Sequence, residues 1–348
     1  METRKIQQVG GGTYTVSLPK GWAEAEGITA GTVVDLHTHI DVLIGVQVRA
    51  GEDAPTCGVD VRVDHESAER VERTLRAAYA AGAEEVVLDA ATAFTDDQQR
   101  VIERVCRDLT GVTVAEASPA RASVRTLLDA EEVSIRQSVR QLRFVALAMH
   151  RDATAALLGE APAHGTDRDD QADRLFALID RHFARGLARL AEVDALGLTR
   201  PELFELRTTA HELERVADGA ERIATLAGEK EGSVPEPVAD EVRPVARAAR
   251  SVVDDAVDAV VGDAAVEDAH RALDARDRVR VEVDALDRRL FEDEAGDYRL
   301  ARALDALRRT AERGGTVAEL ALRAAIRRGE LSAPADGDPA DHPAPTDG

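Results

Sequence analysis

Lysine, aromatic residues and cysteine are scarce in this chain of 348 residues. Only three of the 44 basic residues are lysine (Lys5, Lys20 and Lys230), and aromatic residues make up 3% of the sequence. Cys57 and Cys106 are the only cysteines. Two cysteines without a CxxC spacing provide neither a disulfide framework nor a cysteine-rich metal motif, so we interpret them as ordinary thiols.

Long apolar runs are also absent. No segment approaches the roughly 20 apolar residues that cross a bilayer, and the N-terminal sequence METRKIQQ lacks the apolar core of a signal peptide. The polar faces of the expected helices are acidic, so anionic lipid would repel them. We therefore expect a cytoplasmic protein without membrane insertion.

Acidic residues outnumber basic residues by 66 to 44, which gives a formal net charge of −22. In molar salt electrostatic screening reaches only about 3 Å, so a protein tolerates this self-repulsion. The composition is therefore typical of a halophile. It argues against nucleic-acid binding by the chain as a whole, but the charge is uneven. Residues 1–50 carry a net charge of −1, and the first twenty residues carry +2.

Turn residues and hydrophobic patterns predict an α+β multidomain protein. Residues 1–50 indicate β-structure, with glycine turns at Gly10–Gly12 and Gly31. Residues 58–128 alternate β-branched runs with helical stretches, which predicts a small α/β segment. Its expected strands are 59–63, 85–89 and 112–116, and its expected helices are about 67–81 and 96–109.

Residues 129–330 have the pattern of an all-helical region with about six long helices. A proline- and glycine-rich break at 228–237 divides it into two three-helix halves, about 129–230 and 238–330. Residues 331–348 hold four prolines and four acids but no basic residue, so we predict a disordered acidic tail.

The N-terminal segment combines the loop Gly10–Thr13, the strand TVSLPKGW (15–22) and the join GITAGTVVDL (27–36). In these features it resembles the AbrB/MazE/SpoVT family of swapped-hairpin DNA-binding domains. A hairpin of this size cannot bury its own apolar face, so strand exchange in a homodimer is the natural remedy. The resemblance implies DNA contacts from the loop and strand near the first turn. It nominates Arg4, Lys5, Thr13, Thr15, Ser17 and Lys20.

This N-terminal segment also allows other interpretations. Family members often carry a basic residue in the turn where this chain has Gly10–Gly12, so a hairpin that only dimerises is an open alternative. A phosphate-cradling loop is not favoured, because the strand-then-helix order with a downstream lysine does not follow the glycines. His37 and His39 lie two apart on an expected strand and share one face. We interpret them as solvent-facing rather than as a metal pair.

Two helices of the first helical half carry acidic pairs, Asp169/Asp173 and Glu214/Asp218. On a helical wheel His211 and Glu221 lie on the same side as the second pair. Convergence of the two helices would build an oxygen-rich site that suits hard cations, or iron and manganese. Acids are so frequent in this chain that surface carboxylates adapted to salt are an equally open interpretation.

Six long helices in two halves, with ELERVADGAERIATLA (212–227) closing the third, resemble the PhoU family of phosphate-uptake regulators. The resemblance implies metal clusters held by such acidic pairs, here Asp169, Asp173, Glu214 and Asp218 with iron, manganese or another divalent metal. In the second half Glu312 aligns with Glu214, but Thr316 replaces Asp218. This chain is therefore expected to keep at most one cluster.

No nucleophile–base set, P-loop or dinucleotide motif is present, so we predict a protein that is not an enzyme. The two resemblances imply a DNA-binding transcriptional regulator of phosphate uptake whose helical part senses phosphate status. They also imply contact with a phosphate transporter ATPase or a signalling kinase. Two alternatives are an adaptor that acts by protein contacts alone and a metal-carboxylate enzyme.

Overall fold

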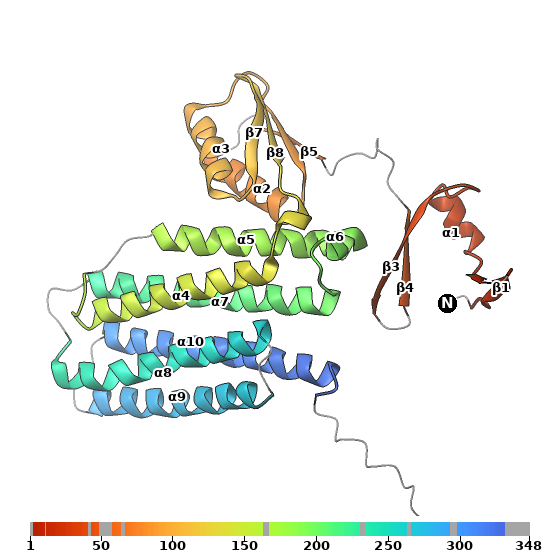
Figure 1. Ribbon diagram of the computed structural model, residues 1–348. Coiled ribbons are helices and arrows are strands. Elements are labelled where there is room, and N and C mark those ends of the chain that lie inside the picture. Colours follow the sequence, from red (N-terminus) through yellow and green to blue (C-terminus); the bar gives the residue numbers. More distant parts are fainter. Residues whose placement is uncertain are drawn as a thin grey trace, which may run out of the picture.

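The computed structural model describes most of the chain (Figure 1). The described residues are 3–10, 12–40, 43–48, 58–63, 67–162, 167–229, 234–262, 266–292 and 298–330. The predicted disordered tail, residues 331–348, lies outside them. Two strand pairs, a four-stranded α/β module and a helical region follow one another along the chain. This arrangement confirms the α+β multidomain fold class.

The N-terminal hairpin domain (residues 3–48) consists of two antiparallel strand pairs with a short helix between them. β1 (Gln7–Val9) pairs with β2 (Thr13–Thr15), and β3 (Val34–Ile40) pairs with β4 (Leu43–Val48). The helix α1 (Lys20–Ala25) lies between these pairs. Each pair has only two strands, so neither can enclose a core of its own.

The α/β module (residues 58–126) is a four-stranded sheet with two helices packed on one face. Its elements are β5 (Gly58–Arg62), α2 (Ala68–Ala80), β6 (Glu85–Asp89), α3 (Asp96–Asp108), β7 (Val112–Ala117) and β8 (Arg121–Thr126). The strand order is β5-β6-β8-β7; β5 and β6 are parallel and the other neighbours are antiparallel. Leu88, Leu75 and Val105 are buried between sheet and helices. The structure contains the expected strands and helices and one further strand, β8, which was not predicted from the sequence.

The helical region follows a short 3₁₀ turn, η1 (Ala130–Glu132). Its first half contains three long helices and one short helix. They are α4 (Ile135–Leu157), α5 (Asp167–Ala188), α6 (Leu190–Ala195) and α7 (Arg200–Gly228). The second half contains α8 (Glu236–Val261), α9 (Val266–Glu292) and α10 (Tyr298–Arg327). The six long helices agree with the expected PhoU-like pair of three-helix bundles, while α6 was not predicted.

The two halves pack against each other over a shared apolar core (Figure 1). α4 contacts α8, and α7 contacts α10. α10 lies so close to α8 that a Cβ on Gly314 would be 2.8 Å from the backbone nitrogen of Val253. Glycine is therefore required at this crossing. Among the described helices, none has the length and apolarity needed to cross a membrane.

Candidate functional site

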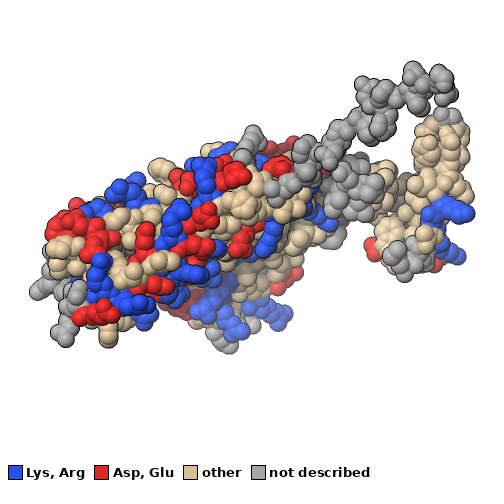
Figure 2. Space-filling model, turned by 90° about the horizontal axis from the view of Figure 1, so that it is seen from below, with Lys and Arg blue, Asp and Glu red and all other residues tan. Residues whose placement is uncertain are grey.

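The six residues nominated for DNA contact lie on one small domain, and all are exposed. Thr13 and Thr15 are on β2, and Ser17 continues the same alternation, so the three side chains share a face. Lys20 begins α1, where its Nζ lies 3.5 Å from Glu24 Oε1. Figure 2 shows this domain as mostly uncharged with a group of basic side chains, whereas the helical region is densely covered by both signs. The domain therefore presents the least acidic surface seen in that view.

The hairpin domain touches the helical region at α6. His37 on β3 is buried, and its Nδ1 is hydrogen-bonded to Asp194 Oδ2. Gln47 on β4 accepts a hydrogen bond at Oε1 from the backbone nitrogen of Leu190 (3.0 Å). A Cβ on Gly45 would lie 2.5 Å from Leu190 Cδ1, so glycine permits this approach.

The expectation that His37 faces solvent was therefore wrong. Its burial comes from α6, which lies about 150 residues further along the chain and gives no signal in the local sequence around β3. The side chain of His39 lies outside the described part of the structure.

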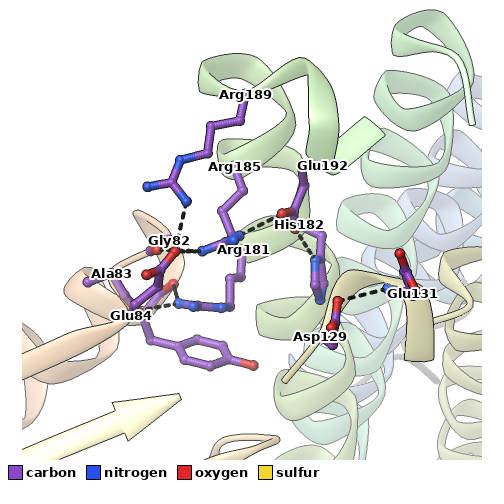
Figure 3. Close-up of polar contacts among 11 residues, drawn as sticks. Gly82, Ala83, Glu84, Asp129, Glu131, Arg181, His182, Arg185, Arg189 and Glu192 are labelled. Carbon is purple, nitrogen blue, oxygen red and sulfur yellow. Dashed lines mark hydrogen bonds and ion pairs between the residues drawn. The ribbon is translucent and has the colours of Figure 1, made fainter. Parts of the chain in front are cut away.

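The α/β module is fixed to α5 by an arginine that is almost fully buried (Figure 3). Arg181 Nη1 donates to the backbone oxygens of Tyr79 (3.0 Å) and Ala83 (2.8 Å), which close the turn after α2. Its guanidinium also lies 4.9 Å from the centroid of the Tyr79 ring. One nitrogen of the guanidinium thus binds both carbonyls while the charged group lies against the aromatic ring.

Neighbouring charged residues complete this junction (Figure 3). Arg185 donates to Glu84 (3.0 Å) and to Glu192 (2.9 Å), and Arg189 donates to Glu84 (2.8 Å). Glu192 on α6 also contacts His182 Nδ1 (2.6 Å). Burial would raise the pKa of Glu192, but its hydrogen bonds to His182 and Arg185 outweigh burial and lower that pKa. The junction thus joins the module, α5 and α6, and α6 in turn touches the hairpin domain.

The predicted metal-binding carboxylates face one another across α5 and α7. Burial raises the pKa of Glu214 to about 7, with further contributions from Asp218, Asp173 and Asp169. Burial, together with the charges of Glu221 and Asp173, raises the pKa of Asp169 to about 6. The pKa of Asp173 is raised by burial and by Asp218. The four nominated residues therefore form one carboxylate cluster, with Glu221 beside it.

The chemistry of this cluster fits a hard cation. Asp169 Oδ1 is a buried oxygen without a hydrogen-bond partner, and the mutual repulsion of the carboxylates would be relieved by positive charge. As the side chains lie, no three His, Cys, Asp or Glu residues of the described chain come close enough to share one ion. A cation would therefore have to draw the carboxylates together.

Basic residues flank the carboxylate cluster without neutralising it. Arg215 lies 3.8 Å from both Glu214 Oε2 and Asp218 Oδ2, beyond hydrogen-bond distance. Arg76 on α2 lowers the pKa of Asp173, which brings the α/β module to the edge of the cluster. No local sequence pattern indicates Arg76, because only the folded chain places α2 against α5.

Comparison with known proteins gives two matches to separate parts of the chain. Residues 139–227 match the PhoU domain. Residues 7–44 match the family described as antidote-toxin recognition MazE, bacterial antitoxin. Both agree with the resemblances that the sequence showed. Together they indicate DNA binding for the N-terminal segment and regulation of phosphate homeostasis for the helical region.

One solved structure with a similar chain is PhoU from Pseudomonas aeruginosa. It is 24% identical, with a TM-score of 0.47, and the similarity covers 56% of this chain and 96% of the PhoU chain. No curated protein matches the chain. The PhoU match covers α7 and the carboxylates on it, so these residues belong to the PhoU-like part of the helical region.

Proposed function

We propose that this protein is a DNA-binding transcriptional regulator of phosphate uptake that is not an enzyme. Its hairpin domain would bind promoters, and its PhoU-like helical region would report phosphate status. The observation that carries the proposal is the presence of a MazE-type segment and a PhoU-type segment in one chain. The contacts of His37 and Gln47 with α6 support it, because they give the two parts a direct mechanical connection.

We propose a homodimer formed through the hairpin domain. Ile6, Tyr14, Leu36 and Ile44 are each more than 60% exposed, although they are apolar and lie on or beside the strand pairs. Exposed apolar residues concentrated on so small a domain indicate an interaction surface. A second copy of the domain would cover them and would place two DNA-binding faces side by side.

The carboxylate cluster is the proposed metal site, with Asp169, Asp173, Glu214 and Asp218 as ligands. The unpartnered Asp169 oxygen and the raised carboxylate pKa values support it. Iron, manganese or another divalent cation would supply the positive charge that the cluster lacks. Metal analysis of the purified protein and of a Glu214→Ala/Asp218→Ala variant tests the assignment. Equal metal content in the two proteins would exclude it.

A mobility-shift assay in molar KCl tests DNA binding directly. The wild-type protein should shift fragments from upstream of phosphate-transport genes, and a Lys5→Ala/Lys20→Ala variant should bind more weakly. Arg280→Ala is a matched control, because Arg280 is an exposed arginine on α9, far along the chain from the hairpin domain. Failure of the wild-type protein to bind any such fragment would contradict the proposal.

The competing proposal is an adaptor whose hairpin domain only dimerises. It is favoured by the turn at Gly10, which carries no basic side chain, and by the exposed apolar residues of the domain. Such an adaptor would act on a phosphate transporter ATPase or a signalling kinase. Occupancy of chromatin under phosphate limitation separates the two, because an adaptor would show none.

A further inference from the structure

A groove between α7 and α10 is lined by more basic than acidic residues, although the chain as a whole is strongly acidic. The groove encloses about 560 Å³, within the usual range for small-molecule sites. Five arginines line it: Arg215, Arg222, Arg302, Arg309 and Arg313. Its acidic lining residues are Asp218 and Asp305. The lining thus carries a net charge of +3 in a chain whose formal charge is −22.

The helical period explains why the arginines converge. Arg215 and Arg222 are seven residues apart on α7, and so are Arg302 and Arg309 on α10, so each pair shares one face of its helix. The helices run side by side, and Arg313 on α10 donates to Glu212 on α7 (3.2 Å). The groove therefore lies on the seam between the two three-helix halves.

Several of these cations lack a full carboxylate partner. Among the described residues, Arg222 makes no hydrogen bond or ion pair, and Arg302 donates from Nε to the neutral Tyr298 hydroxyl (3.2 Å). Arg309 shares Asp305 with Arg308, so one carboxylate serves two guanidinium groups. Arg215 lies 3.8 Å from Asp218. The guanidinium groups are thus free to turn toward a ligand in the groove.

A glycine in the wall of the groove is an independent observation. Gly219 lies inside α7, where glycine is less favourable to the helix than alanine. Apart from the backbone of α7 itself, no atom comes within 4 Å of the position that its Cβ would occupy, so packing does not require a glycine there. Its missing side chain leaves that wall of the groove open beside Arg215 and Arg222.

A larger cavity of about 750 Å³ lies at the junction of α5 with the α/β module, but its charges are balanced. Its arginines are bound to carbonyl or carboxylate oxygens, as Arg181 and Arg185 illustrate. Those residues hold the module in place. In the α7–α10 groove Arg313 links α10 to Glu212 on α7, but Arg222 and Arg302 have no carboxylate partner among the described residues.

We propose that the α7–α10 groove binds a phosphate-bearing anion. Guanidinium groups are suited to phosphate, because they offer paired donors in a plane that matches two phosphate oxygens. The groove is large enough for a nucleotide or a polyphosphate as well as for orthophosphate. Such a ligand would be an effector of the proposed phosphate-status regulator. This physiological role of the groove rests on the proposed function.

Isothermal titration calorimetry of the full-length protein tests the groove, with orthophosphate, pyrophosphate and ATP as separate probes in the same KCl buffer. At least one probe should bind with a Kd below about 1 mM. Arg222→Ala/Arg302→Ala should weaken that binding by about tenfold or more, while Arg280→Ala should leave it unchanged. Binding of ATP alone identifies a nucleotide site, and binding of orthophosphate identifies a site for the free anion.

A second variant tests the groove in case the double arginine variant does not fold. Gly219→Leu fills the groove without changing charge, and its folding is checked by circular dichroism. It should weaken binding by a similar factor. Absence of binding by all three probes, or unchanged affinity in folded arginine and glycine variants, would overturn the inference. The mobility-shift assay measures DNA binding separately, so failure of the groove and failure of the proposed regulator give different results.

Discussion

Replacing Glu214 with glutamine is expected to stabilise the metal-free protein above neutral pH. In the folded protein burial and the neighbouring Asp218 raise the pKa of this carboxyl to about 7, against an ordinary value of 4.5. The folded state keeps the proton up to about pH 7, while the unfolded chain releases it at a much lower pH. The free energy of unfolding therefore falls as pH rises across this window and is constant above it.

The size of the effect follows from the shift. A change from 4.5 to about 7 corresponds to a loss of about 3 kcal/mol by pH 8. The Glu214 side chain is 19% exposed, so solvent screens only part of the unfavourable interactions of its carboxylate. Glutamine keeps the shape and carries no charge, so Glu214→Gln should recover about 2–3 kcal/mol at pH 8. It should have little effect near pH 5.

Scanning calorimetry in KCl with a chelator, from about pH 5 to pH 8, measures this difference. Glu312→Gln is the matched control, because Glu312 aligns with Glu214 in the second half but has Thr316 in place of the second acid. Its Tm should stay close to that of the wild-type protein at every pH. A Glu214→Gln variant that is less stable than the wild-type protein at pH 8 would refute the reasoning, since it would mean that Glu214 is not destabilised by burial and repulsion.

Three further changes test other parts of the structure. Arg181→Met should lower the free energy of unfolding by about 2–3 kcal/mol and speed hydrogen exchange around Ala83, because the Ala83 carbonyl loses its donor while the Tyr79 carbonyl keeps only the Gly82 N–H. Arg189→Met, on a more exposed side chain, should cost under about 1 kcal/mol. Gly314→Ala should destabilise the helical region by about 1–3 kcal/mol in chemical denaturation, because its Cβ would meet the backbone of α8; no loss would mean that α8 can move away. Gly45→Val should speed exchange in β4 and α6 by separating them, whereas Gly21→Ala, in open space, should not.

Much of the secondary structure could be predicted from local patterns of residue types in the sequence. β-branched runs identified β5, β6 and β7, because alternate residues of these strands face the core. β8 has the sequence RASVRT, in which only Val124 and Thr126 are β-branched and two arginines face outward, so it lacked the expected signal. Its pairing with β6 and β7, rather than its propensity, makes it a strand.

The candidate sites also contain some residues that a local pattern predicts and others that it does not. The acidic pairs on α5 and α7 were visible because each pair follows the helical period within a single helix. Arg76, Arg181 and the arginines of the α7–α10 groove were not predicted, because their partners lie on elements far apart in the chain. His37 shows the same limit, since a residue on a short strand becomes buried only when α6 reaches it.

α7 presents the carboxylate cluster on one side and the arginine groove on another, and Arg215 and Asp218 border both. A cation bound by Glu214 and Asp218 would compete with Arg215 for these oxygens and turn its guanidinium toward the groove. An anion in the groove would draw Arg215 away from the carboxylates in the same manner. Thermodynamic linkage makes the two effects equal, so cation and anion should each raise the affinity for the other. α7 would then couple the binding of two ions of opposite charge, so that both sites fill most readily when both ions are present.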